Sequence, residues 1–397
     1  MHHKMLHQKI RTTRGLFLFS ILSSVFISSC HRDTHVKSEE ETAYMADYES
    51  PSAKWGFLNK EGELVIKAEY DDVGPFSEGL AAVNKNGLWG FIDPEGNMAI
   101  QPIYKSAWAF HENMARVQQF DQPEQFIDRK GKPLDSDNWS AADDFSNGRA
   151  RVKVGNSFGY IDSSGKLLVQ PIFTRGWNFA DDLCIVEYQE KLGVINLKGD
   201  YVLQPKYDFI KIIPGTKVIL CRQGTTAFAF TAEGTELTNI PESKMMDCDG
   251  HLVSVRKGTN MYLLNLSEKK PIDTTLYINI IYLEDSLWAG KTKEGYVLLD
   301  PEGKPLTTIA YRQINKFSNG LAAYSKGDYW GYMNKQGVEL TKDVFGLAWD
   351  YKEGLARAAF KDGIAFIDEQ QKLAFYPPMG SLDMRDFSEG MASVQMQ

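Results

Sequence analysis

The sequence predicts an all-β fold made of ten tandem repeats, each roughly 34 residues long. Three observations support this fold class. From Trp55 onward the chain is self-similar, with unit starts 34 or 35 residues apart. Its apolar runs are rich in β-branched and aromatic residues, and glycine-containing turns interrupt the units before a helical period can develop. We expect three-stranded antiparallel meanders that form a propeller-like ring or an open superhelical β-array.

Residues 1–29 have the pattern of a secretory signal. An apolar run of 13 residues, 15–27, follows a basic region. This run is shorter than the roughly 20 residues that a membrane-spanning helix needs. The basic residues are Lys4, Lys9, Arg11 and Arg14.

The end of this signal, Ile27-Ser28-Ser29-Cys30, resembles the lipobox of bacterial lipoproteins. The resemblance implies cleavage before Cys30 and acylation of its thiol and new amino group, which anchors the chain to a membrane. Residues 30–54 are then a flexible polar tether. In some bacteria an Asp directly after the lipidated cysteine retains a lipoprotein at the inner membrane, and here that position is His31. We therefore expect the chain to be anchored at the outer membrane, on either its periplasmic or its surface face.

Each repeat opens with a strand that carries an aromatic-Gly-aromatic pattern. The clearest copies start at Trp55, Trp89, Phe158 and Trp330. Weaker copies start at Glu124, Leu192, Ala227, Met261, Tyr296 and Ile364. The ten units fill residues 55–397 and leave no room for an inserted domain.

A turn follows this first strand. When the opening residue is counted as position 1, position 5 is Asn or Asp in nine units and position 8 is Gly in eight, as in Asp93 and Gly96. The Asx side chain caps a tight turn, and glycine adopts the left-handed conformation after it without a Cβ clash. The pattern therefore predicts a hairpin in almost every unit.

Two further strands complete the unit. The run after the turn, such as 98–104, contains a proline that indicates an edge or a bend. A loop then leads to a Phe-Ser-x-Gly-Leu-Ala motif, clearest at 76–81 and 317–322. This motif opens the third strand, which turns back into the next unit.

The combination of Trp-Gly-Phe-Ile-Asp…Gly with Phe-Ser-x-Gly-Leu-Ala resembles the bacterial WG-repeat family, also called KWG repeats. The resemblance covers residues 55–397 and weakens from Ala227 to Gly295. It implies an all-β, propeller-like repeat. It implies no reaction, because the family offers no shared catalytic residues.

The strands are apolar on both faces, so neighbouring units must cover them. The array starts at the Trp55 strand without the strand that elsewhere precedes it, and it ends with that kind of strand at 387–394. We expect these two ends to pair and close a ring, since pairing removes both exposed edges. An open array with two uncovered ends is the alternative.

Composition and motifs argue against several classes of function. A net charge of −8 and an isoelectric point near 5.5 disfavour nucleic acid as a partner. No phosphate-binding glycine loop, dinucleotide fingerprint or paired Cys-x-x-Cys motif is visible, so we expect no cofactor. Outside the signal and tether, the only histidines are His111 and His251, which lack metal-site spacing.

Three aspartate pairs and three cysteines remain to be interpreted. The pairs are Asp71 with Asp72, Asp143 with Asp144, and Asp181 with Asp182. They could be calcium ligands or a glycosidase pair, but their different offsets in the units favour turn-capping residues. The cysteines, Cys184, Cys221 and Cys248, lie in or beside apolar runs, which predicts buried small apolar side chains.

Two sets of aromatic residues recur at fixed positions. The first set, at position 16, is expected in the core and comprises Tyr70, Tyr104, Trp139, Phe173, Tyr207, Tyr311 and Phe345. The second set is Trp108, Trp177 and Trp349, all at position 20, where other units carry residues such as Gly74, Lys211 and Asp383. Because a position that tolerates such residues is a poor core position, these tryptophans are candidates for binding a partner or a glycan.

We therefore expect a non-catalytic cell-envelope lipoprotein whose repeats present a surface to a protein or glycan partner. Two alternatives remain: a structural or adhesive spacer in the envelope, and a glycan-active enzyme on a propeller-like scaffold.

Overall fold

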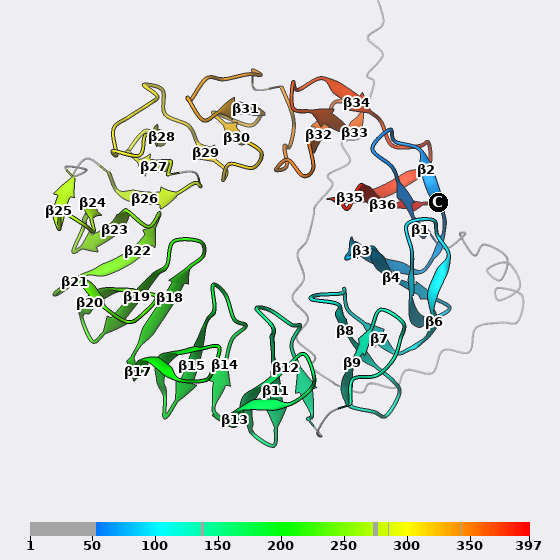
Figure 1. Ribbon diagram of the computed structural model, residues 1–397. Coiled ribbons are helices and arrows are strands. Elements are labelled where there is room, and N and C mark those ends of the chain that lie inside the picture. Colours follow the sequence, from blue (N-terminus) through cyan, green and yellow to red (C-terminus); the bar gives the residue numbers. More distant parts are fainter. Residues whose placement is uncertain (1–52, 136–138, 273–276, 285, 343) are drawn as a thin grey trace, which may run out of the picture. The chain divides into compact units, whose positions relative to one another are not determined.

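The computed structural model describes residues 53–397 except 136–138, 273–276, 285 and 343. The signal, Cys30 and nearly all of the tether lie outside the described residues. In the compact unit Pro51–Gln397, the described strands form ten small antiparallel sheets arranged in a ring (Figure 1). The predicted all-β propeller-like fold is confirmed, and the sheets are numbered here as blades 1–10.

The first five blades contain these strands. Blade 1 has β3 (Asp72–Ser77), β4 (Leu80–Lys85), β5 (Leu88–Ile92) and β6 (Met98–Tyr104). Blade 2 has β7 (Ser106–Ala107), β8 (Met114–Gln118) and β9 (Glu124–Asp128). Blade 3 has β10 (Ala141–Ala142), β11 (Arg149–Val154), β12 (Ser157–Asp162) and β13 (Leu167–Phe173). Blade 4 has β14 (Arg175–Gly176), β15 (Leu183–Tyr188), β16 (Lys191–Asn196) and β17 (Tyr201–Tyr207). Blade 5 has β18 (Phe209–Ile213), β19 (Val218–Gln223), β20 (Thr226–Thr231) and β21 (Glu236–Ile240).

The remaining blades complete the ring. Blade 6 has β22 (Lys244–Cys248), β23 (Leu252–Lys257), β24 (Asn260–Asn265) and β25 (Lys270–Ile272). Blade 7 has β26 (Asn279–Tyr282), β27 (Trp288–Lys291) and β28 (Tyr296–Leu299). Blade 8 has β29 (Gln313–Ile314), β30 (Leu321–Ser325) and β31 (Trp330–Asn334). Blade 9 has β32 (Leu355–Phe360), β33 (Gly363–Asp368) and β34 (Leu373–Phe375). Blade 10 has β35 (Ser381–Ser388) and β36 (Met391–Met396), together with β1 (Lys54–Leu58) and β2 (Leu64–Tyr70).

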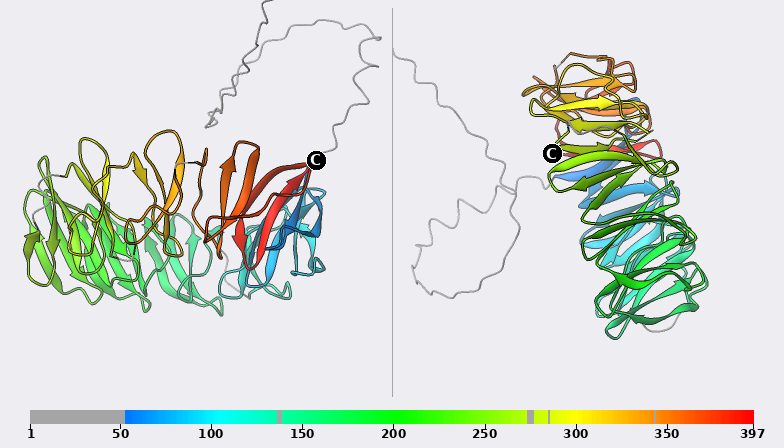
Figure 2. Two further views of the ribbon diagram at one scale, coloured as in Figure 1. Left: turned by 90° about the horizontal axis from the view of Figure 1, so that it is seen from above. Right: turned by 90° about the vertical axis from the view of Figure 1, so that its left-hand side faces the viewer.

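The blades are offset from the sequence units. Where neighbouring blades have four strands, a sequence unit forms the last two strands of one blade and the first two strands of the next blade. The first unit, for example, forms β1 and β2 of blade 10 and then β3 and β4 of blade 1. The first strands surround the centre of the ring (Figure 1), and the strands run between its two rims (Figure 2). Six of the described sheets have four strands. The structure thus adds to the predicted meander an inner strand made by the residues before the Phe-Ser-x-Gly turn.

The glycine of the Trp-Gly pair is required by a close backbone approach. The pairing of β5 with β6 shifts register between Trp89 and Phe91. This irregularity brings the outer strand so near that a Cβ on Gly90 would lie 2.5 Å from the carbonyl oxygen of Ile100. Gly159 and Gly193 meet the outer strands of blades 3 and 4 in the same way.

The hydrophobic core is distributed between neighbouring blades. One cluster joins Phe91 and Tyr104 of blade 1 to Phe110 and Val117 of blade 2. The position-16 aromatics are all buried, as the sequence predicts. Because each blade face is covered by the next blade, the stability of one unit depends on its neighbours.

The last strand closes the ring. In blade 10, β36 pairs with β1 in an unbroken antiparallel register from Lys54 opposite Met396 to Leu58 opposite Ala392. It pairs with β35 on its other side. The predicted closure is therefore confirmed, and the open array is excluded.

Candidate functional site

A serine contact links successive blades near the inner strands. In the Phe-Ser-x-Gly motif the hydroxyl of Ser77 donates to the carbonyl oxygen of Phe110 in the next blade at 2.7 Å. Ser146 and Ser318 make the same contact at 2.7 and 2.6 Å. Ser388 repeats it across the closure, donating to Phe76 at 2.8 Å. Each hydroxyl thus donates a hydrogen bond to a backbone carbonyl oxygen of the neighbouring blade.

The acidic residue after the serine extends this connection. The carboxylate of Glu78 accepts hydrogen bonds from the backbone N–H groups of Glu112 and Asn113 in the next blade, each at 2.7 Å. Glu389 does the same for Glu78 and Gly79, at 2.7 Å each. These turns have positive φ angles, for example 54° at Glu78, and this conformation points their N–H groups outward, where they can donate to an anion.

Glu353 belongs to the same series of acidic residues. It accepts from the N–H groups of Glu389 and Gly390 at 2.6 and 2.9 Å, and Lys60 Nζ lies 3.2 Å from its carboxylate. Burial alone would raise the pKa of Glu353, but these hydrogen bonds and the lysine charge hold it below its usual value. The carboxylate is therefore stabilised in its charged form.

The structure places the three candidate tryptophans at equivalent points on the inner wall. Each lies in the innermost segment of its blade, bonded to the second strand: the N–H groups of Trp108, Trp177 and Trp349 donate to the carbonyl oxygens of Arg116, Ile185 and Arg357. They belong to blades 2, 4 and 9. Position 20 thus lies in the innermost segment of each of these blades, and the three indoles belong to three different blades.

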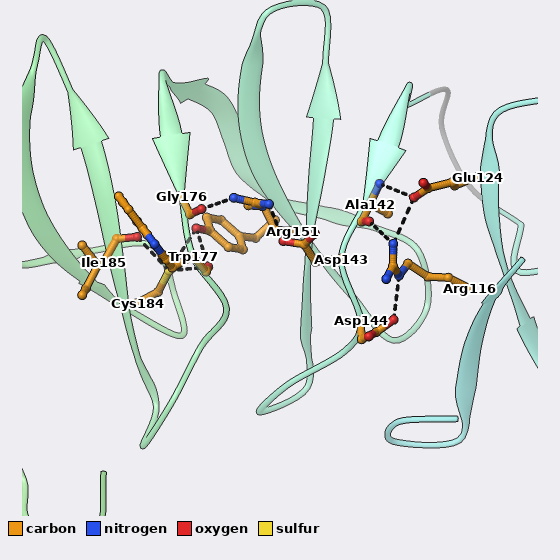
Figure 3. Close-up of polar contacts among 11 residues, drawn as sticks. Arg116, Glu124, Ala142, Asp143, Asp144, Arg151, Gly176, Trp177, Cys184 and Ile185 are labelled. Atoms are coloured by element: carbon orange, nitrogen blue, oxygen red, sulfur yellow. Dashed lines mark hydrogen bonds and ion pairs between the residues drawn. The ribbon is translucent and has the colours of Figure 1, made fainter. Parts of the chain in front are cut away.

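Two of these indoles support arginines that connect blades. The Arg116 guanidinium stacks on Trp108 with its carbon 4.4 Å from the ring centre. Its Nε donates to Asp144 of blade 3 at 2.6 Å and its Nη1 to Ala142 O at 2.8 Å (Figure 3). Cation–π stacking of this kind holds the guanidinium in place for charge-assisted bonds.

The same arrangement recurs in blade 9. Arg357 stacks on Trp349 at 4.8 Å, and it donates to Asp386 at 2.6 Å and to Met384 O at 2.8 Å, both in blade 10. Trp108 and Trp349 are only partly exposed. Sequence reasoning missed these arginines, although both stand eight residues after their tryptophan.

Trp177 differs from the other two. Its paired residue is Ile185, which cannot stack as a cation, and the tryptophan is 41% exposed. The nearest stacked cation is Arg175, 5.9 Å from the ring centre and itself exposed. Its carbonyl oxygen accepts from the Tyr160 hydroxyl at 3.0 Å (Figure 3). Trp177 therefore combines a fixed backbone with an accessible indole.

The aspartate pairs have structural partners. Asp143 pairs with Arg151 at 2.5 Å and Asp144 with Arg116, while Asp72 pairs with Arg385 at 3.2 Å. Asp71 pairs with Lys54, and Asp181 accepts from Gly215 N. In the part of the chain that the structure describes, no group of three or more His, Cys, Asp or Glu side chains is placed to hold a metal ion.

The three cysteines are buried and free, as expected. Burial raises the pKa of the Cys184 thiol to about 11 and that of Cys248 to about 12. Cys184 also contacts the Tyr160 hydroxyl at 2.9 Å. Thiols held protonated in this way are poor nucleophiles.

Several solved structures are similar to this chain at low sequence identity. Among solved structures, similar chains include the computationally designed Ika8 protein, at 13% identity, a TM-score of 0.34 and coverage of 74% of this chain and 94% of that one. Hsv2p of Kluyveromyces lactis follows at 13% identity and a TM-score of 0.30, with coverage of 66% and 96%. A structure described as the eukaryotic initiation factor has 9% identity, a TM-score of 0.39 and coverage of 73% and 95%. No curated protein matches the sequence.

No helix among the described residues is both long enough and apolar enough to cross a membrane. The profile of the family described as WG containing repeat matches more than half of the chain. The matched stretches are residues 55–89, 89–119, 126–157, 158–191, 193–213, 298–330 and 330–363. These stretches supply strands to most blades of the closed ring, and the chain therefore belongs to the WG containing repeat family.

Proposed function

We propose that this protein is a non-catalytic cell-envelope lipoprotein whose WG-repeat ring binds a protein or glycan partner through its inner wall. The observation that supports this most is Trp177, a residue that is 41% exposed and whose backbone is held by three hydrogen bonds. A rigid, accessible tryptophan supplies a large apolar face for a sugar ring or a partner side chain without an entropic cost.

The proposed anchor is Cys30, which resembles a lipobox cysteine. Acyl chains on this residue would attach the ring to the envelope, by analogy at the outer membrane, through the tether of residues 31–54. Fractionation of cells into inner and outer membranes, with detection of the intact chain, tests this placement.

The binding experiment compares two single variants of the full lipidated chain. The bait captures partners from detergent-solubilised envelope, and the same protein is tested against an array of envelope glycans. We expect Trp177→Ala to reduce capture or glycan binding at least tenfold. The matched control is Tyr329→Ala, which removes an aromatic side chain that is 58% exposed and lies between strands β30 and β31.

Equal capture by Trp177→Ala and by the unaltered chain would contradict the proposal. Such a result would favour a structural spacer, for which the inner wall carries no partner. A glycan that is bound and also cleaved would contradict the non-catalytic part of the proposal.

A further inference from the structure

A groove between blades 5 and 6 is lined by three cationic side chains. A cavity of about 370 Å³ is lined by Arg222 of β19, Lys244 of β22 and Arg256 of β23, and by one carboxylate residue, Glu242. A second cavity of about 230 Å³ shares Arg222 and Lys244. The two cavities therefore adjoin and form one groove of a size that suits a small molecule.

The cations of the groove have no carboxylate partner. Arg222 donates to Gly224 O at 3.3 Å, and Arg256 to Ile278 O at 3.3 Å. Across the described part of the ring, no carboxylate lies within ion-pairing distance of Arg222, Lys244 or Arg256.

Two of these cations also repel each other. In the register of β22 and β23, Lys244 stands directly opposite Arg256, and like charges in such cross-strand pairs are destabilising. The carboxylate of Asp208 accepts from Lys191 at 2.6 Å and from Gly224 N at 2.7 Å, and it makes no ion pair with Lys244 or Arg256. An anion in the groove would remove this repulsion.

The other half of the groove is apolar. The smaller cavity is lined by Phe209, Met245 and Met246. Phe209 and Met246 are 42% and 43% exposed, although both are large apolar side chains. Methionine adapts its shape to different apolar groups, so this wall fits a flexible or flat hydrocarbon body.

The sequence sets this region apart as well. The family profile stops at residue 213 and resumes at 298. The groove residues other than Phe209 lie in this unmatched stretch, so repeat packing does not account for them.

We propose that the groove between blades 5 and 6 binds a small organic acid that carries one anionic head and an apolar body. The head lies between Arg222 and Lys244 in charge-assisted hydrogen bonds, and the body lies against Phe209 and Met246. This site is separate from the indoles of the inner wall and does not depend on the function proposed above.

The test uses three probes. Octanoate carries both the anionic head and the apolar body, 1-octanol carries the body without the charge, and acetate carries the head without the body. The protein is the full chain with Cys30→Ser, and titration calorimetry measures each affinity. We expect octanoate to bind at least tenfold more tightly than either other probe. We also expect octanoate to raise the thermal midpoint of the ring, because a ligand that binds only the folded state stabilises it.

Variants then locate the binding. Arg222→Gln with Lys244→Gln should weaken octanoate binding at least tenfold and leave the free protein no less stable, since one cross-strand repulsion is lost. The matched control, Lys270→Gln with Arg312→Gln, removes two exposed cations elsewhere and should leave the affinity unchanged. Met246→Ser should weaken octanoate but not acetate.

Octanoate that binds no better than 1-octanol would overturn the proposal, because the cations would then contribute nothing. An equal loss in the groove variant and in the control variant would also overturn it, since net charge rather than the groove would set the affinity.

Discussion

At the scale of single residues, exposure on the inner wall depends on two positions of the repeat rather than one. Position 20 carries Trp108, Trp177 and Trp349, but the residue paired with it decides how far the indole is covered. Arginine at the paired position stacks on the ring, whereas Ile185 leaves Trp177 open. The repeat offset predicted the shared placement. The stacking could not be predicted, because it requires the strand pairing to be known.

This difference predicts unequal effects of two tryptophan substitutions. Trp349→Ala removes the platform under Arg357, so the guanidinium loses a stacking interaction worth roughly 1–2 kcal/mol when partly desolvated. We expect a lower thermal midpoint for this variant and a nearly unchanged one for Trp177→Ala. Differential scanning calorimetry of both variants measures the effect, and an equal loss in the two would show that Trp177 is a packing residue.

A second residue-scale prediction concerns Cys30, which lies outside the described residues. Replacing it with serine removes the thiol that the lipobox resemblance implies is acylated. We expect Cys30→Ser to abolish metabolic labelling by a fatty-acid analogue and to give soluble or unprocessed protein. Undiminished labelling would disprove the lipoprotein interpretation.

The lowered pKa of Glu353 predicts a specific pH dependence. A carboxyl group whose pKa is lower in the folded than in the unfolded state, near 4.3 for glutamate, stabilises the fold above that value. This contribution disappears as the pH falls through the lower, folded-state pKa. Glu353→Gln should therefore have a lower thermal midpoint than the unaltered chain at pH 7, and the difference should shrink below about pH 4. A difference that is constant from pH 7 to pH 3 would contradict this role of the charge.

At the scale of the element, the sequence predicted three of the four strands of a blade. The innermost strand was missed, because the sequence predicted a loop there, both where the strand has only two residues, as in β7, β10, β14 and β29, and where it is longer, as in β3 and β18. Such a strand has no alternating pattern of its own, since its residues also contact the next blade. The contacts of Ser77 and Glu78 were missed for a related reason: their acceptors and donors are backbone groups one unit further on.

The Trp-Gly glycines allow a test at this scale. Gly90→Ala would place a Cβ 2.5 Å from Ile100 O and 2.7 Å from Pro102 N, so the outer strand of blade 1 must move. Overpacking of this kind costs about 1–3 kcal/mol. The matched control is Gly74→Ala, whose Cβ would meet Ala82 at an ordinary 3.6 Å. Thermal unfolding should separate the two variants, and equal midpoints would mean that the glycine is not needed for the close approach.

At the scale of the whole molecule, closure was predictable because the surplus strand at one end complements the missing strand at the other. The structure shows how firmly the ends are joined: β36 pairs with β1, and Ser388 and Glu389 bond to blade 1. The groove between blades 5 and 6 could not be predicted, because its residues come from units in which the repeat pattern is weak.

Deletion of residues 387–397 tests the role of closure. The deletion removes β36, so β1 keeps only β2 as a partner and the cores of blades 10 and 1 are exposed. We expect a loss of several kcal/mol, roughly that of a packed strand with its buried side chains. Hydrogen exchange should become faster in the blades on both sides of the gap. Unchanged protection of β1 to β6 would contradict a stabilising role for closure, and removal of Gln397 alone is the control.

The offset between sequence units and blades has a consequence for the gene. Because each unit donates strands to two blades, a recombination event that gains or loses one whole unit leaves the two chain ends unchanged. The first strand of the chain, β1, still lacks an inner neighbour from its own unit, and the last strand, β36, still fills that place. The circumference of such a ring can therefore change by one blade at a time during evolution, while the seam that joins the termini is inherited intact.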